Sequence, residues 1–191
     1  VEESCNLASG IRESALLKIG DNEIFLHLLP RPDELLIIGA AHIGLHLVSL
    51  ARELGFHTVV IDPRQVFATG ERFVVAPDEL LIDWPATALL GRPIGRNTYA
   101  IILTHDPKID DEALHHLLMT DAAYIGALGS MKTHARRRER LQKAGFSESV
   151  IDRIRGPAGL SIGAMTPAEI ALAILAQVVE SKQQKPLSSA I

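Results

Sequence analysis

The chain has 191 residues and a formal net charge of −4; 47% of its residues are hydrophobic and 4% are aromatic. This length allows one domain with a substantial core plus a small appendage, and the apolar content argues against a disordered chain. The charge balance implies no general polyanion-binding surface, so a nucleic-acid partner is disfavoured.

Cys5 is the single cysteine, which excludes an intramolecular disulfide and a zinc site built from several thiolates. We interpret it as a free thiol near a chain end. The sequence shows neither an apolar run of about 20 residues, as a membrane span requires, nor the basic-then-apolar pattern of a secretory signal. These absences predict a cytoplasmic protein with no membrane partner. The chain begins with Val1, as a fragment or a processed product would.

The first 32 residues differ from the rest and predict an N-terminal arm, or the remnant of a preceding domain. A strand is predicted over residues 24–29, after which Pro30 and Pro32 interrupt the chain like a linker. Residues 33–181 are predicted to form the main domain, and residues 182–191 a C-terminal tail.

From Glu34 onward, strand and helix patterns alternate. Short apolar or β-branched runs predict strands at residues 35–38, 58–61, 100–103 and 123–125, with a weaker one at 72–75. Apolar spacing and caps predict helices over residues 43–54, 111–119 and 131–144, and from Pro167 onward behind a capping box of Thr166 and Glu169. This alternation predicts an α/β fold with a doubly wound, Rossmann-like parallel sheet and helices on both faces.

A glycine motif joins the first of these strands to its helix, at residues 36–44 (LIIGAAHIG). Gly39 would allow the tight turn, Gly44 would let the helix pack close to the strand, and the helix N-terminus can hold an anion. Ala41 stands where the usual dinucleotide pattern has a second glycine. The motif therefore leaves open a Rossmann-like domain that has lost its nucleotide.

Two histidines on the first helix, His42 and His46, have a spacing that can chelate a metal. No nearby carboxylate completes a triad, so we predict no metal site. We expect His42 to point into the ligand crevice and His46 to be solvated.

Asp62 ends the second predicted strand, where a carboxylate can bond a ribose hydroxyl. Alone it could equally be a turn residue before Pro63. Arg64 follows two residues later and is a candidate to meet a phosphate instead.

The segment Thr104-His105-Asp106 directly follows the strand at residues 100–103. In the common doubly wound order this strand neighbours the first one, and ligands bind at the carboxyl ends of the two. His105 is therefore predicted to face the same cavity as the Gly39 turn, as an acid, a base or a ligand. The alternative is a loop histidine that bonds a backbone carbonyl.

A second glycine-bearing turn contains Gly126, Gly129 and Ser130, and Ser130 is a good N-cap for the helix that follows. Lys132 and Arg136 are nearest this turn and are candidates to hold an anionic group. The remaining arginines of this helix are predicted to form a solvated face: Arg137, Arg138 and Arg140.

Taken together, the motifs resemble the XdhC/CoxI family, the accessory proteins of xanthine dehydrogenases and related molybdenum hydroxylases. The resemblance covers most of residues 30–180, and five motifs in order carry it: LIIGAAHIG at 36–44, VIDPR at 60–64, THDPKID at 104–110, YIGALGS at 124–130 and PAGLSIGAMTPAEIA at 157–171. The chain differs from the family pattern at Ala41, where glycine is usual, and at Pro107, where a second histidine is often found. It also contains little of the family's amino-terminal domain.

The resemblance implies a molybdenum-cofactor chaperone without turnover of its own. Such a protein binds molybdopterin, supports its sulfuration with a cysteine desulfurase and passes it to the apo-hydroxylase. On this hypothesis the helix N-termini near Gly39 and Gly126 hold the phosphate or nucleotide tail, and His105, Lys132 and Arg136 address the polar pterin or oxo groups.

Two other functions stay open. One is an NAD(P)-dependent oxidoreductase with His105 as the acid, which Asp62 favours and Ala41 disfavours. The other is a non-catalytic Rossmann domain that docks a partner. A homodimer built on the apolar residues 172–176 is also open, although burial of these residues against the sheet is the simpler interpretation.

Overall fold

The computed structural model describes residues 15–19, 22–26 and 32–183. The chain divides into two compact units, residues 1–31 and residues 32–191. In the first unit, strands β1 (Ala15–Ile19) and β2 (Asn22–Leu26) pair in antiparallel fashion. The strand predicted over residues 24–29 thus falls partly in β2. Its remainder, the predicted Pro30 break, Cys5 and most of the predicted tail lie outside the described residues.

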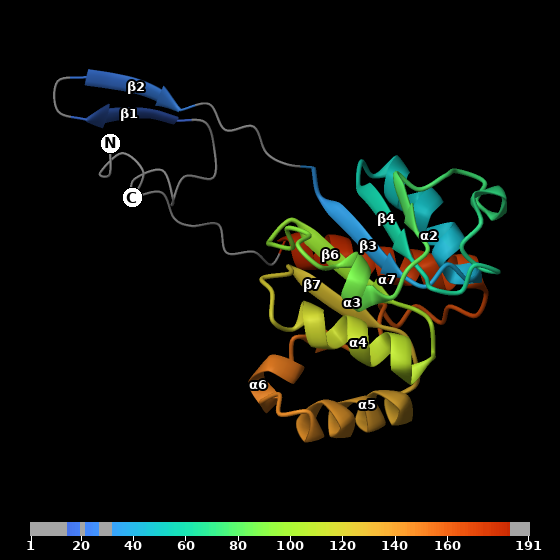
Figure 1. Cartoon of the computed structure of the whole chain (residues 1–191). Coiled ribbons are helices and arrows are strands. Elements are labelled where there is room, and N and C mark those ends of the chain that lie inside the picture. Colours follow the sequence, from blue (N-terminus) through green and yellow to red (C-terminus); the bar gives the residue numbers. More distant parts are fainter. Residues whose placement is uncertain (1–14, 20–21, 27–31, 184–191) are drawn as a thin grey trace. The chain divides into compact units, whose positions relative to one another are not determined.

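The second unit is built on a six-stranded parallel sheet with the order β5-β4-β3-β6-β7-β8 (Figure 1). The strands are β3 (Glu34–Ile38), β4 (His57–Ile61), β5 (Glu79–Leu81), β6 (Thr98–Ile102), β7 (Tyr124–Ala127) and β8 (Ile154–Arg155). From β3 the chain adds β4 and β5 toward one side of the sheet, and from β6, which pairs with β3, it adds β7 and β8 toward the other side. The predicted doubly wound, Rossmann-like fold is confirmed.

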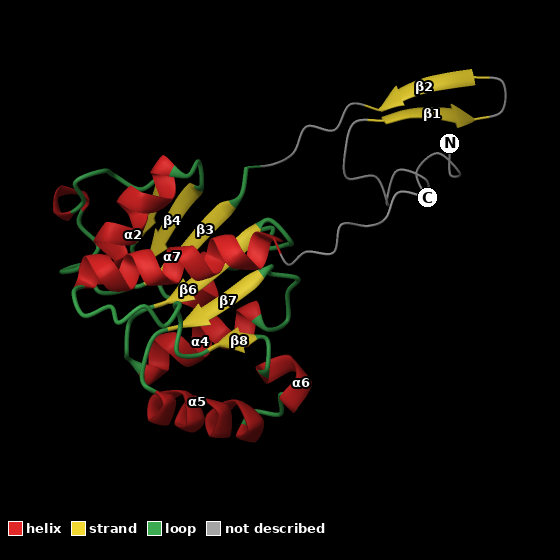
Figure 2. Cartoon of the chain, turned by 180° about the vertical axis from the view of Figure 1, so that it is seen from behind, coloured by secondary structure: helices red, strands yellow, loops and turns green. Residues whose placement is uncertain are grey.

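Helices cover both faces of this sheet (Figure 2). One face carries α2 (His42–Glu53) and α7 (Pro167–Gln183), which pack against each other. The other face carries α4 (Pro107–Leu117) and α5 (Met131–Lys143). Shorter elements complete the unit: the 3-10 turn η1 (Gly70–Arg72), α3 (Pro85–Ala88) and α6 (Glu148–Ile151).

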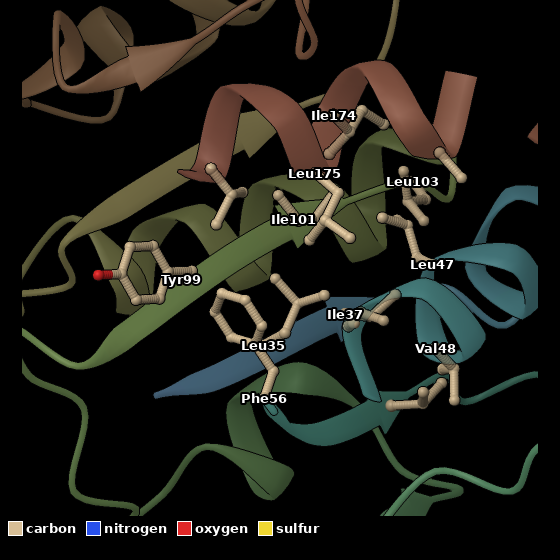
Figure 3. Packing of buried hydrophobic residues seen from close by; sticks show 14 of the residues in the cluster. Leu35, Ile37, Leu47, Val48, Phe56, Tyr99, Ile101, Leu103, Ile174 and Leu175 are labelled. Atoms are coloured by element: carbon tan, nitrogen blue, oxygen red, sulfur yellow. The ribbon is translucent and has the colours of Figure 1, made fainter. Parts of the chain in front are cut away.

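The central strands are buried on both faces, which explains their unbroken apolar sequences. Leu35 and Ile37 belong to the cluster under α2 and α7, together with Leu47 and Ile174 (Figure 3). Leu36 and Ile38 alternate with them and belong to the cluster under α4 and α5. Each such fully buried side chain contributes roughly 1.5–3 kcal/mol to folding, so β3 anchors both layers.

The strand predicted at residues 72–75 was wrong. Arg72 ends the 3-10 turn η1, and residues 73–75 join no strand of the described sheet. Phe73 is buried, but Val74 is 95% exposed. The free edge of β4 is taken instead by β5. Asp78 fixes that pairing, because its carboxylate accepts hydrogen bonds from the backbone N–H and the hydroxyl of Thr58 at 2.8 and 2.9 Å.

Two helix starts were set by capping. Helix α4 begins at Pro107, four residues before the predicted start, because the Asp106 carboxylate accepts the backbone N–H of Lys108 and proline suits the first helical position. The predicted capping box of α7 is confirmed: Glu169 accepts the N–H of Thr166 at 2.9 Å, and the Thr166 hydroxyl accepts the N–H of Glu169 at 3.3 Å.

Replacing Gly44 by alanine tests the close approach of α2 to β3. A Cβ at Gly44 would lie 2.7 Å from the backbone oxygen of Gly39, which cannot move aside as a side chain can. Alanine is the better helix former, yet we expect Gly44→Ala to lower the free energy of unfolding by about 1–3 kcal/mol in urea titrations. Gly70→Ala is the control, because a Cβ there meets no atom within 4 Å. Equal unfolding midpoints for the two variants would refute the packing argument.

Candidate functional site

The Gly39 turn lies between the carboxyl end of β3 and the start of α2. Gly39 has a φ of +114° and donates its N–H to the oxygen of Ile61, which ties the turn to β4. Ala41 is the N-cap residue of α2, and no side chain caps this helix. Its first turn also contains no acidic residue. The partial positive charge and the first N–H groups of α2 are therefore open to an anionic ligand.

The other two helices at this edge of the sheet differ from α2 in this respect. Asp106 caps α4, and Ser130 caps α5 by accepting the N–H of Thr133 at 3.2 Å. Both glycine turns predicted to hold an anion therefore precede a helix N-terminus, but only α2 among the three helices lacks a side-chain cap in the described structure.

Asp62 lies at the carboxyl end of β4 and is fully buried. Its carboxylate accepts the N–H of Ala40 at 2.9 Å, so it holds the glycine turn directly. It also accepts three N–H groups of Arg64: the backbone N at 3.0 Å, Nε at 2.9 Å and Nη2 at 2.8 Å. The oxygens predicted to bond a ribose are thus already occupied by the protein itself.

The electrostatics of Asp62 follow from these bonds. Burial by itself would raise the pKa of the Asp62 carboxyl, but the hydrogen bonds from Arg64 and Ala40 and the charge of Arg64 together outweigh it and lower the pKa. The carboxylate is the favoured form because every acceptor site that burial takes from water is replaced by an N–H donor.

Two arginines flank the same turn. The guanidinium carbon of Arg64 lies 4.5 Å from the ring centroid of Phe67, and that of Arg72 lies 5.4 Å from it. Arg72 also donates to the backbone oxygens of Ala40 and Phe67 at 3.2 and 2.9 Å. The charge of Arg64 is paired with Asp62, whereas Arg72 forms no ion pair within the described residues, so its positioned guanidinium is suited to an anionic group.

The predicted Thr104-His105-Asp106 segment emerges beside the Gly39 turn. A Cβ placed on Gly39 would lie 3.0 Å from the methyl group of Thr104, so the two loops are in contact. His105 is exposed and has a φ of +61°, which is uncommon for a residue with a side chain. Strain of this kind persists only where the surroundings hold it, and it clusters at functional sites.

Asp110 and Arg137 hold this loop, and sequence reasoning missed both. The Thr104 hydroxyl donates to Asp110 at 2.6 Å and accepts the N–H of Asp106 at 3.1 Å. Arg137, predicted to be solvated, is 1% exposed and donates to the oxygen of Leu128 at 3.0 Å and, at 3.5 Å, to Asp110. Burial raises the pKa of the Asp110 carboxyl, while Thr104 and Arg137 oppose that shift. The sequence signal available for Asp110 was its place in the THDPKID motif at residues 104–110.

Two of the other arginines of α5 are paired rather than simply solvated: Arg138 with Asp152 and Arg140 with Asp111. Lys132 and Arg136 are exposed and form no ion pair within the described residues. Gly126 lies inside β7, where a Cβ would meet the ring of Tyr124 at 2.6 Å, so its lack of a side chain has a packing reason.

The histidines of α2 are both exposed. His42 is the first residue of the helix, beside the Gly39 turn, and His46 lies one turn further along. In the described part of the chain, no group of three or more His, Cys, Asp or Glu side chains is arranged to hold a metal ion.

A polar hollow of about 290 Å³ lies at the opposite edge of the sheet, by residues 122–125 and Arg153. Arg153 is committed to structure there, because it donates to the backbone oxygens of Leu118, Thr120 and Ala122. Ligands of doubly wound sheets bind at the carboxyl ends of the strands, so we place the candidate site at the Gly39 edge.

The comparisons with known proteins agree with this geometry. The model of the XdhC Rossmann domain matches residues 35–178. The chain belongs to this family. It is 29% identical to a probable xanthine dehydrogenase component of Bacillus subtilis (strain 168), over 85% of this chain and 47% of the relative. It is 34% identical to the "Molybdenum cofactor insertion chaperone PaoD" of Escherichia coli (strain K12), over 50% of this chain and 29% of the relative.

A solved structure supports the assignment to the XdhC family. A crystal structure of a xanthine dehydrogenase from Bacillus halodurans superposes with a TM-score of 0.73 at 35% identity, over 91% of this chain and 50% of the other. The chain thus spans about half or less of the length of the relatives it matches. Within the described residues, no helix has the length and apolar character needed to cross a membrane.

Replacing Asp62 by asparagine tests the buried carboxylate. Asn removes the charge that Arg64 and Ala40 address, so we expect Asp62→Asn to lower the free energy of unfolding at pH 7 by about 1–3 kcal/mol. The folded-state pKa is lowered, so the contribution is present above the unfolded pKa of about 4 and is lost as the pH falls through the folded value.

The measurement is urea unfolding of the wild type and the variant between about pH 7 and pH 3. The gap between them should narrow below about pH 4. Asp121→Asn, at an exposed carboxylate, serves as the control and should show no such gap. A gap that stays constant with pH would mean that the Asp62 charge does not stabilise the fold.

Proposed function

We propose that this chain is the cofactor-binding domain of an accessory protein that matures a molybdenum hydroxylase of the xanthine dehydrogenase type. It holds the molybdenum cofactor as cargo, assists its sulfuration and passes it to the apo-hydroxylase. The observation that carries the proposal is the uncapped N-terminus of α2 beside the strained His105 loop, in a chain that belongs to the XdhC family.

The residues of the site fit such a cargo. Molybdopterin carries a phosphate, for which the first N–H groups of α2, after the Gly39 turn, are suitable donors. Gly44 keeps α2 close enough to β3 for its N-terminus to reach the crevice. Arg72, bonded to the oxygen of Ala40 and held near the ring of Phe67, adds a positive charge at the same edge. His105, on the neighbouring loop, is the group we assign to the polar edge of the cargo.

An NAD(P)-dependent oxidoreductase is the weaker alternative. A ribose diol needs the acceptor oxygens of Asp62, and these are bonded to Ala40 and Arg64. Binding would require Arg64 to leave a paired, buried carboxylate, which carries a cost. Ala41 adds a Cβ where the backbone of dinucleotide-binding turns is bare.

The partners and the location follow from the same proposal. The relative PaoD is named as a chaperone for insertion of the molybdenum cofactor, so an apo-hydroxylase is the expected recipient for this chain. A cysteine desulfurase is the expected source of sulfur, and the cytoplasm the expected location. In the stretch considered for a homodimer, Ala173, Ile174 and Leu175 are buried against the sheet, so Leu172, which is half exposed, is the side chain there that a second copy would contact.

Replacing His105 by glycine separates ligand binding from folding. Glycine adopts a φ of +61° without the cost of a Cβ, so we expect His105→Gly to leave stability unchanged or to raise it by up to about 1 kcal/mol. The same change removes the imidazole and should weaken binding of molybdopterin by about ten-fold or more.

Anaerobic calorimetry with molybdopterin, and separately with NAD⁺, provides the measurement, with thermal unfolding recorded in parallel. His105→Ala is the companion variant, because it also lacks the imidazole but keeps the strained backbone. Binding of NAD⁺ alone would move the protein to the oxidoreductases. Failure of wild type to bind either molecule would favour a docking domain.

A further inference from the structure

An apolar cavity lies at the carboxyl end of β7, on the face of the sheet that carries α7. Its volume is about 530 Å³, within the usual range for small-molecule sites. Its walls come from three segments: the end of β7 with the start of α5, the loop at residues 157–164, and α7. The side chains that carry the argument are Leu128, Met131, Leu160, Ile162 and Ile170.

The cavity lies at the same end of the sheet as the candidate site, two strands away from β3. Leu128 donates its N–H to Ile102 at the end of β6, and Leu103 donates its N–H to Ile38 at the end of β3. The Gly39 turn and the mouth of the cavity are therefore separated by two strand spacings, about 10 Å. The Thr104-His105 loop emerges from the strand between them. A single ligand with an anionic end and an apolar, flat end can reach both places.

The lining of the cavity indicates the chemistry of that flat end. No charged side chain lines it, and the thioether of Met131 is a favourable contact for an aromatic ring. Gly163 has a φ of +74°, and a Cβ there would meet no atom within 4 Å, so the loop is bare at this point of the cavity wall. Gly159, with a φ of +105°, packs against Ala173 and Ile174 of α7 instead. The N–H groups of residues 158–160 and of Ile162 donate within the protein, whereas those of Ser161, Gly163 and Ala164 form no hydrogen bond with the described residues. These free N–H groups can pair with the ring edge of a heterocycle, while the apolar side chains cover its faces.

We propose that this cavity binds the pterin ring system of the cargo, while the Gly39 turn binds its phosphate. The inference rests on the proposed function and deepens it, because it assigns a separate subsite to the ring. On this assignment, Met131 and Ile162 contact the faces of the ring, and His105 lies between the two subsites.

A free pterin without a phosphate, 6-hydroxymethylpterin, tests the ring subsite through its own fluorescence. Met131→Asp introduces a carboxylate at the rim without disturbing α5, because an acidic residue is favourable in the first turn of a helix. Ile162→Asp does the same from the opposite loop, at a residue that is 54% exposed. Each variant should weaken pterin binding by about ten-fold or more, because the new charge must be desolvated beside the ring.

Met165→Asp is the matched control. Met165 lies in the same connection before α7 and is 86% exposed, but it does not line the cavity, so its pterin affinity should equal that of the wild type. The wild type and the three variants are then titrated with molybdopterin. Met131→Asp and Ile162→Asp should again bind more weakly than the wild type and Met165→Asp.

Molybdopterin binding that Met131→Asp and Ile162→Asp leave unchanged would overturn the ring subsite and leave the proposed function standing. If the cavity variants weaken binding of the free pterin but the wild type does not bind molybdopterin, the ring subsite stands and the proposed function is overturned. An equal loss in the Met165→Asp control would also overturn the assignment, because the effect would then be one of surface charge alone.

Discussion

The buried carboxylate of Asp62 is the constraint on which the candidate site depends. A carboxylate with no exposure to water is tolerated only when its acceptor sites are filled, and here they are filled by N–H groups of Ala40 and Arg64. The pairing joins the turn after β3 to the segment after β4. The N-terminus of α2 is thereby held at one place relative to the end of the sheet.

That pairing also decides which ligand chemistry the crevice offers. With Asp62 paired to Arg64, the groups left near the turn are donors: the first N–H groups of α2 and the guanidinium group of Arg72. Such a set favours an anionic end of a ligand over a sugar hydroxyl pair. It is a Rossmann crevice in which the usual ribose contact has been turned into an internal one.

A second buried carboxylate supports the opposite wall. Asp110 accepts the Thr104 hydroxyl and faces Arg137, and together they fix the loop on which His105 adopts its positive φ. The Arg137 guanidinium also bonds Leu128, at the entrance to the apolar cavity. The Gly39 turn, the His105 loop and the cavity are thus linked by two polar networks built on different helices and strands.

The sequence by itself determined the alternation of buried strands and amphipathic helices, the glycine turn and the caps at Ser130 and Thr166, because periodicity and capping act within a few residues. It also carried the family resemblance through five ordered motifs. Only the tertiary structure decided that the Asp62 carboxylate is hydrogen-bonded to Arg64, that Arg137 is buried, and that β5 rather than residues 72–75 extends the sheet. Those outcomes depend on which partner a polar or apolar group meets when water is removed, and the partners are brought together only by folding: Asp62 reaches Ala40 over 22 residues, and Arg137 reaches Asp110 over 27.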